Sequence, residues 1–313
     1  MNSHSEHVSV LLNECISGLN IKPDGIYVDG TTGLGGHSSR IAERLSEKGR
    51  LICIDRDENA IEFSKNRLAC FSDNTTFVHG NFCDVQAILN DLGIYRVDGM
   101  LFDLGVSSPQ LDEKERGFSY MQDSPLDMRM DRSKGITAAG ILNESSENEL
   151  ARILWEYGEE RYSRKIAYAI CQAREQHRLE TTGELVEIIK SALPAKALRE
   201  KQHPAKRSFQ AIRIAVNDEL GSIEKMMDTA PDCLNPGGRL CIISFHSLED
   251  RIVKNKAASR EKGCTCPREA PVCTCGFVQT LKPVYRKPVL PSEEEISSNP
   301  RSRSAKLRIY ERV

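Results

Sequence analysis

The chain has 313 residues, of which 28% are charged and 39% hydrophobic, so it is long enough for one large domain or two smaller ones. No apolar run approaches a membrane span and the polar first residues do not resemble a secretion signal, so we expect a cytoplasmic protein with no membrane partner. The eleven cysteines are then expected to be reduced thiols.

The net charge of −2 hides an uneven distribution. Residues 251–313 contain 14 Lys and Arg against 6 Asp and Glu, whereas the rest of the chain has 29 against 39. A basic tail on an acidic body is typical of a protein that contacts a polyanion along one rim. A solvated basic face is the alternative.

The first third of the chain alternates apolar strands with amphipathic helices. Strands are expected at residues 26–29, 51–55, 76–79 and 97–103, with helices at 38–48 and 58–71. Alternation of this kind predicts an α/β fold with a parallel sheet. The next clear strand is 239–245, and a single helix is expected at 209–234 before it.

About 100 residues separate strand 97–103 from that helix, far more than a crossover needs. Their apolar spacing predicts helices at 146–156, 161–176 and 182–192 and no strand. We therefore expect an inserted all-helical domain at 107–207, between core parts 1–106 and 208–313. After a helix at 247–258, strand-like segments at 277–285 and 306–312 predict a late antiparallel pair that closes the sheet.

A glycine-rich turn follows the first strand. Gly33, Gly35 and Gly36 leave room for a ligand beside the backbone, and Asp55 ends the next strand, where a carboxylate accepts hydrogen bonds from a ribose. Ser38 stands where a dinucleotide site needs a glycine, so a nucleoside without phosphates, such as S-adenosylmethionine, fits better. A plain tight turn is the alternative interpretation.

Two further strand ends carry candidate catalytic groups. Asp103 ends its strand at the switch point of such a sheet, and Asp103 or the following Ser107 and Ser108 could accept the hydrogens of an amine substrate. An acid that caps the next turn is the alternative. His246 follows strand 239–245 directly, and is either a catalytic group at the same edge or a hydrogen-bonded structural residue.

Two further segments carry candidate binding residues. The mixture of aromatics, methionines and charges at 116–131 suggests a loop that covers the mouth of the site. The basic, serine-rich run 299–306 is expected to be extended and to contact phosphates, with Phe118 and Tyr120 as stacking faces for an unpaired base. We expect Trp155 and Tyr157 to pack within the insert.

Four cysteines lie close together in two C-x-C pairs. They are Cys264, Cys266, Cys273 and Cys275. This spacing is compatible with a structural zinc site but lacks the C-x2-C signature of zinc fingers, so free surface thiols remain the alternative.

Taken together, these segments resemble one family, the bacterial 16S rRNA cytosine-N4 methyltransferases (RsmH or MraW). The resemblance includes Asp29-Gly-Thr-Thr-Gly-Leu-Gly-Gly-His37 and spans nearly the whole chain. The other matching stretches are residues 7–14, 103–112, 116–130, 158–161, 207–220, 244–251 and 299–306. Ser9 departs from the proline usual in the family, which affects the N-terminal arm only.

The resemblance implies a class I S-adenosylmethionine-dependent methyltransferase, with a Rossmann-like seven-stranded sheet and an inserted helical domain. It implies methyl transfer to N4 of a decoding-centre cytidine, cytosine-1402 of 16S rRNA, in the small ribosomal subunit; a homodimer is compatible with it. The cofactor contacts that it implies are Gly35, Gly36, His37, Asp55, Phe82, Asp103 and Gln110. The catalytic candidates are Asp103, Ser108 and His246.

Three rivals remain open at this stage. The first is a small-molecule methyltransferase on the same core, for which the basic tail would be incidental. The second is a ribosome-assembly factor that binds the nucleoside only as a switch. The third is a DNA cytosine-N4 methylase, which the lack of a tandem-proline loop after Asp103 disfavours, so we expect no DNA partner.

Overall fold

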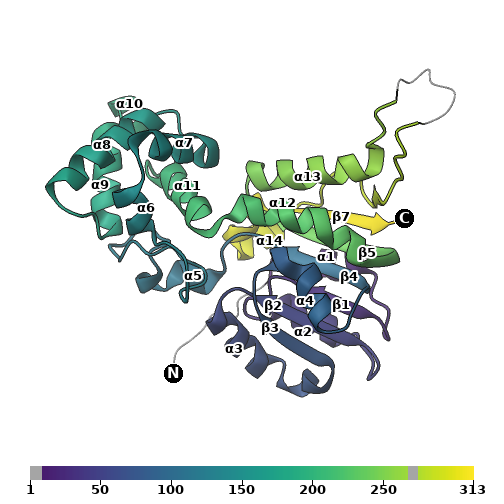
Figure 1. Cartoon of the computed structure of the whole chain (residues 1–313). Helices are drawn as coiled ribbons and strands as arrows, with labels where there is room; N and C mark the ends of the chain where they lie inside the picture. Colours follow the sequence, from purple (N-terminus) through teal and green to yellow (C-terminus); the bar gives the residue numbers. More distant parts are fainter. Residues whose placement is uncertain (1–8, 267–273) are drawn as a thin grey trace. The chain divides into compact units, whose positions relative to one another are not determined.

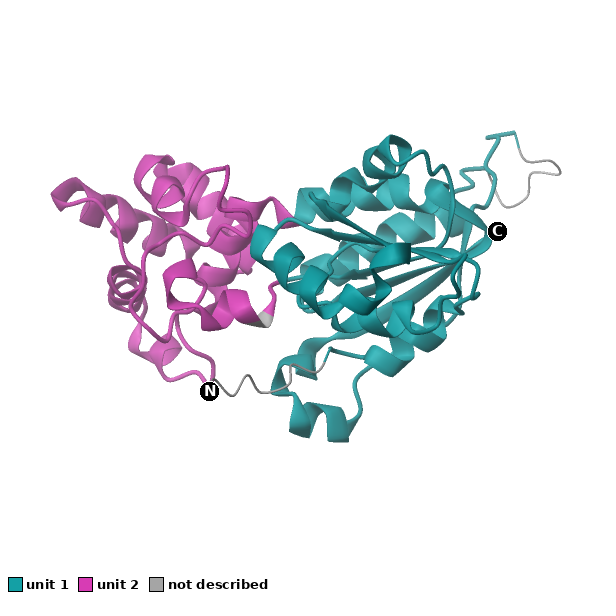
Figure 2. Cartoon of the chain, turned by 90° about the horizontal axis from the view of Figure 1, so that it is seen from below, with its two compact units in different colours: residues 1–105, 220–313 teal, residues 106–219 magenta. Residues whose placement is uncertain are grey.

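A computed structural model describes residues 9–266 and 274–313 and divides the chain into two compact units (Figure 2). The sheet unit comprises Met1–Gly105 and Leu220–Val313, and the helical unit is Val106–Glu219. The first junction matches the expected one to within a residue. The second lies at Glu219 and not at 207, because α11 (Lys206–Asn217) packs into the core of the helical unit.

The sheet unit is built on one seven-stranded sheet. Its strands are β1 (Ile26–Asp29), β2 (Arg50–Asp55), β3 (Thr75–His79), β4 (Val97–Asp103), β5 (Leu234–Ser244), β6 (Leu281–Pro283) and β7 (Lys306–Arg312). They follow the order β3-β2-β1-β4-β5-β7-β6, with β7 antiparallel to both β5 and β6 and all other pairs parallel. This arrangement confirms the class I methyltransferase fold predicted from the sequence.

Helices cover both faces of the sheet (Figure 1). One face packs against α4 (Val85–Asp91), α12 (Glu219–Thr229) and α13 (Ser247–Lys262). The other packs against α1 (Leu12–Leu19) and α2 (Gly36–Ala42), and against Leu68 at the end of α3 (Glu58–Arg67). Along β4, Met100 and Phe102 face the first layer and Leu101 the second. Because both faces are covered, the parallel strands are continuously apolar and therefore easy to recognise in the sequence.

The helical unit has its own core. Its helices are α5 (Ser108–Asp112), α6 (Ala138–Glu144), α7 (Glu147–Gly158), α8 (Ser163–Gln176), α9 (Thr182–Ala192), α10 (Ala195–Leu198) and α11 (Lys206–Asn217). The described residues of this unit contain no strand, as the sequence predicts. Tyr157 packs against this core as expected, whereas the side chain of Trp155 is 60% exposed, so the prediction for Trp155 was wrong.

The unusual composition of residues 116–131 has a packing explanation. Phe118, Leu126, Met128 and Met130 are all buried in the core of the helical unit. The buried Arg116 guanidinium donates to the carbonyl oxygens of two residues at the far end of the segment, 3.2 Å and 2.9 Å away. This segment is therefore part of the unit's interior, which replaces our interpretation of it as a loop over the site's mouth.

The helix expected at residues 209–234 is two helices. The chain breaks at Asp218, whose φ of 46° lies in the left-handed region, and α12 begins at the next residue. Asn217 accounts for the break, because its amide donates to Met128 O at 2.7 Å and accepts from Met130 N at 2.8 Å. These bonds tie the end of α11 to an interior segment, which the helical period alone does not show.

The C-terminal segments also differ from expectation in detail. The strand expected at 277–285 is only Leu281–Pro283. The run at 299–306, which was expected to be extended, contains the 3-10 helix η5 (Pro300–Ser304) and follows α14 (Glu293–Ser298). No helix among the described residues is long and apolar enough to cross a membrane.

Candidate active site

Three neighbouring strands of the sheet unit end in an aspartate. Asp29 ends β1, Asp55 ends β2 and Asp103 ends β4. The carboxyl ends of parallel strands meet at one edge, and the sheet order reverses between β1 and β4. This is where open α/β sheets bind their ligands, so this edge is the candidate site.

Asp55 is held by the backbone of the glycine-rich turn. Its Oδ2 accepts from Gly33 N at 2.7 Å and its Oδ1 from Asp57 N at 2.9 Å. Burial is the main cause that raises the pKa of Asp55 to about 6. The carboxylate therefore fixes the turn and remains at the strand end, where the sequence predicts a ribose contact.

Gly35 and Gly36 lack side chains that would collide with neighbouring protein atoms, in addition to forming the turn. Gly35 has a φ of 74°, and a Cβ there would lie 2.9 Å from Leu68. At Gly36 a Cβ would lie on the hydroxyl of Ser9, in the N-terminal arm. The missing side chains thus make room for protein atoms at both positions, so any ligand contact would have to come from their backbone.

Asp29 is a component of the site that our sequence reasoning missed. It is fully buried, and its carboxylate accepts from Ser38 Oγ at 2.6 Å and from Thr31 N at 3.2 Å. Burial is the largest cause that raises the pKa of Asp29 to about 6. The signal was present in the sequence, because Asp29 ends its apolar strand just as Asp55 and Asp103 end theirs.

Asp103 has a buried carboxyl oxygen with no hydrogen-bond donor among the described residues. Its backbone N–H donates to Thr31 Oγ1 at 2.6 Å, which fixes the residue, but its buried Oδ1 has no hydrogen-bond partner among the described residues. Burial, followed by repulsion from the Asp29 and Glu249 carboxylates, raises the pKa of Asp103 well above its usual range. A buried acceptor without a donor is costly, so a ligand that brings a donor or a positive charge satisfies this atom.

His37 links Asp103 to the N-terminal arm. Its Nε2 lies 3.0 Å from the carbonyl oxygen of Val10, which only accepts, so Nε2 carries a proton. Nδ1 then faces Asp103 Oδ2 at 3.8 Å. The ring is 5% exposed, so this imidazole is buried beside the Asp103 carboxyl.

Phe82 lies on the 3-10 helix that follows β3. Its ring meets that of Phe102 edge to face, with centroids 5.9 Å apart. Gly30 permits this packing, because a Cβ there would lie 2.3 Å from the Phe102 ring. Phe82 is half-buried, so one part of its ring remains available to an adenine, as the resemblance implies.

His246 caps a helix. Its Nδ1 accepts from Glu249 N, while Glu249 Oε2 accepts from the backbone N–H groups of Phe245 and His246 at 2.7 Å and 3.2 Å. This is a capping box at the start of α13. It gives His246 the structural role that we had weighed against catalysis, and Glu249 acts on the site through its charge.

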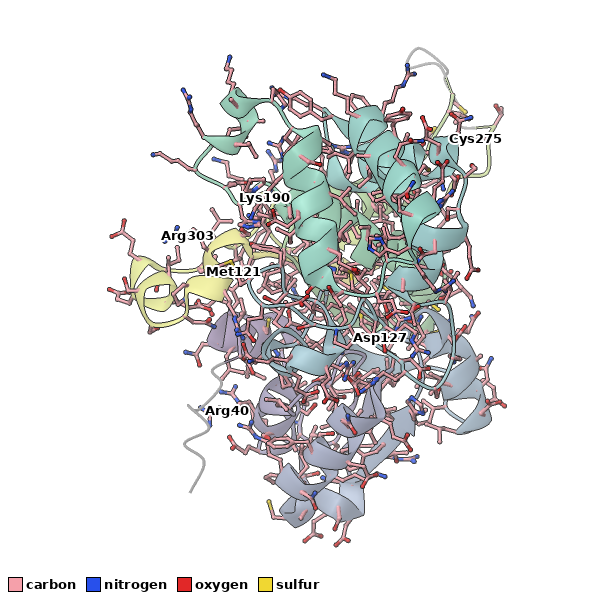
Figure 3. The ribbon with its side chains drawn as sticks, turned by 90° about the vertical axis from the view of Figure 1, so that its left-hand side faces the viewer. Arg40, Met121, Asp127, Lys190, Cys275 and Arg303 are labelled. Carbon is pink, nitrogen blue, oxygen red and sulfur yellow. The ribbon has the colours of Figure 1, made fainter. Side chains whose placement is uncertain are left out.

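Among the remaining predicted residues, the side chains of Gln110 and Arg303 are described. Gln110 belongs to the helical unit, where its side-chain oxygen accepts from Ser107 N at 3.1 Å in a capping box at the start of α5. The side chain of Ser108 and all of Cys273 lie outside the described part of the structure. Arg303 is exposed on η5 and is labelled in Figure 3.

Comparison with known proteins decides the family. The model of the MraW methylase family matches residues 4–313. The chain belongs to the MraW methylase family. It is 56% identical to Ribosomal RNA small subunit methyltransferase H of Brevibacillus brevis, with 98% of each chain covered, and 54% identical to that of Clostridioides difficile, with 98% of this chain and 99% of the relative covered.

A solved SAM-dependent O-methyltransferase from Thermotoga maritima matches with a TM-score of 0.42 and 9% identity, covering 99% of this chain and 68% of that chain. This similarity is too distant to inform function.

For a methylase, the three aspartates form an anionic edge suited to a cationic methyl donor. The described residues provide no Lys or Arg salt bridge to Asp29 or Asp103.

Proposed function

We propose that this methylase transfers the methyl group of S-adenosylmethionine to N4 of a cytidine in 16S rRNA, cytosine-1402. The observation that carries the proposal is the unpartnered, buried Oδ1 of Asp103 at the switch point of a methyltransferase sheet. The relatives named as small-subunit rRNA methyltransferases support the substrate class.

The residues at the sheet edge fit S-adenosylmethionine. Asp55 would accept from the ribose hydroxyls, and the half-buried Phe82 would lie against the adenine. The cofactor also carries a positively charged sulfonium, which the buried carboxylates of Asp29 and Asp103 favour electrostatically. When bound, it supplies an electrophilic methyl group, so the protein needs no covalent intermediate.

Asp103 would activate the amine. The lone pair of cytosine N4 is delocalised into the ring, and a carboxylate that accepts the amine hydrogens turns the nitrogen toward the methyl group. The raised pKa of Asp103 also suits it to take the proton that the nitrogen releases on methylation. Thr31 is a positioning residue, since its hydroxyl oxygen accepts from the Asp103 backbone N–H, and the buried His37 ring lies beside the carboxyl. The base must leave any stack to reach this edge.

The proposal predicts a salt dependence that a small-molecule methylase would lack. Arg303→Ala should reduce the slope of log affinity against log salt concentration by about 0.7 to 0.9, because a lost phosphate contact releases fewer counterions. The measurement is equilibrium binding to undermethylated small ribosomal subunits across a salt series.

Lys48→Ala is the matched control, because it removes one exposed positive charge from the acidic part of the chain. The wild type and this control should share the steeper slope. An affinity that does not fall as salt rises would count against an RNA substrate contacted through the basic tail. An equal change of slope in Arg303→Ala and Lys48→Ala would do the same.

A further inference from the structure

Three thiols converge between α13 and β6. The sulfur atoms of Cys264, Cys266 and Cys275 all lie within 4.8 Å of one another, although eight residues separate Cys266 from Cys275 in the sequence. Cys264 Sγ and Cys275 Sγ are 3.6 Å apart, and all three cysteines are free of disulfides. Cys275 is labelled in Figure 3.

This spacing matches metal thiolates better than a disulfide or scattered thiols. Sulfur atoms bonded to each other lie about 2.05 Å apart. Sulfurs that share a tetrahedral zinc ion at about 2.3 Å lie roughly 3.8 Å apart. The observed 3.6 Å falls close to the second value.

Backbone hydrogen bonds hold the three cysteines close together. Thr274 N donates to Cys266 Sγ at 3.3 Å, the kind of N–H···S bond that orients a metal-binding thiolate and stabilises its charge. The base of the segment is closed independently of the thiols, because Thr280 N donates to Arg260 O at 3.0 Å. The Phe277 ring also packs where a side chain on Gly263 would stand. The ligands are therefore brought together by the fold.

We propose that Cys264, Cys266 and Cys275 bind a zinc ion that joins the chain just after α13 to the chain just before β6. Soft thiolate ligands select zinc over the hard cations magnesium and calcium. The site would be structural, because α13 starts at the candidate active site and its 16 residues place its far end roughly 24 Å away. Nothing at the catalytic edge depends on this ion.

The test uses the full-length reduced protein and the metal alone. Titration with Co²⁺, which replaces zinc in such sites, should produce thiolate-to-cobalt charge-transfer absorption that saturates at a single ion per chain and is displaced by Zn²⁺. Cys264→Ser combined with Cys275→Ser should abolish this absorption. Cys70→Ser, which removes an exposed thiol elsewhere in the sheet unit, should leave it unchanged.

Alkylation of the thiols gives a second readout that is independent of the cobalt absorption. Zinc should protect Cys264, Cys266 and Cys275 from alkylation, detected by mass spectrometry, and leave Cys70 reactive. Absence of the charge-transfer band in the wild type, or equal alkylation of all four thiols with and without zinc, would overturn the proposal. Methyl transfer should survive the double substitution, so failure of this inference is distinguishable from failure of the proposed function.

Discussion

Asp103→Ala is expected to slow methyl transfer by about 10² to 10⁴-fold at saturating cofactor, the range over which a positioned proton acceptor contributes to catalysis. The reason is that the amine would lose the buried acceptor at the end of β4 that orients it in the proposed mechanism. The measurement is single-turnover transfer from labelled S-adenosylmethionine to undermethylated small subunits.

Asp91→Ala is the control for Asp103→Ala, because it removes an exposed aspartate at the end of α4 and should leave the rate unchanged. Cofactor affinity is measured in parallel, so that a lost chemical step is separated from lost binding. Normal transfer by Asp103→Ala would remove this residue from the mechanism.

The pH profile gives an independent readout of Asp103. Burial raises its pKa, so the carboxyl is protonated at low pH and ionises only as the pH rises through that elevated value. Only the ionised form accepts both amine hydrogens, so kcat/KM should increase with pH through this range. The residual activity of Asp103→Ala should lack that rising limb.

Asp55→Ala is expected to weaken S-adenosylmethionine binding by about 10 to 100-fold, because hydrogen bonds from the ribose to a charged group contribute about 1.5–3 kcal/mol. The substitution also frees Gly33 N, so the glycine-rich turn loses the contact that fixes it. Calorimetric titration measures the dissociation constant directly.

Asp55→Asn separates the two roles of this carboxylate. Its single oxygen can keep the bond from Gly33 N, but the ribose then meets a neutral group, so an intermediate loss of affinity is expected. The rate at saturating cofactor should change little in either variant. Unaltered affinity in Asp55→Ala would exclude Asp55 from the cofactor site.

The sheet was predictable because its signal is local. Strands such as β2 and β4 are buried on both faces, so they read as continuous apolar runs, and each ends in an acid. That pattern alone placed Asp55 and Asp103 at one edge. The same reasoning should have included Asp29, whose strand is shorter but ends in the same way.

The features that escaped prediction depend on contacts distant in the sequence. Asn217 ends α11 by bonding to a segment almost ninety residues earlier, which no helical period can reveal. At Gly36 a side chain would meet Ser9 of the N-terminal arm, a packing reason for glycine that the local motif does not show.

The most direct test of the proposed function is to offer labelled S-adenosylmethionine with three substrates, namely undermethylated small ribosomal subunits, free 16S rRNA and duplex DNA, and to identify the product nucleosides by mass spectrometry. We predict N4-methylcytidine at a single position of the rRNA, in the subunit or the free RNA, and none in DNA. Intact cofactor binding with no methyl incorporation into either form of the rRNA would contradict the proposal and favour a small-molecule substrate or a binding-only role.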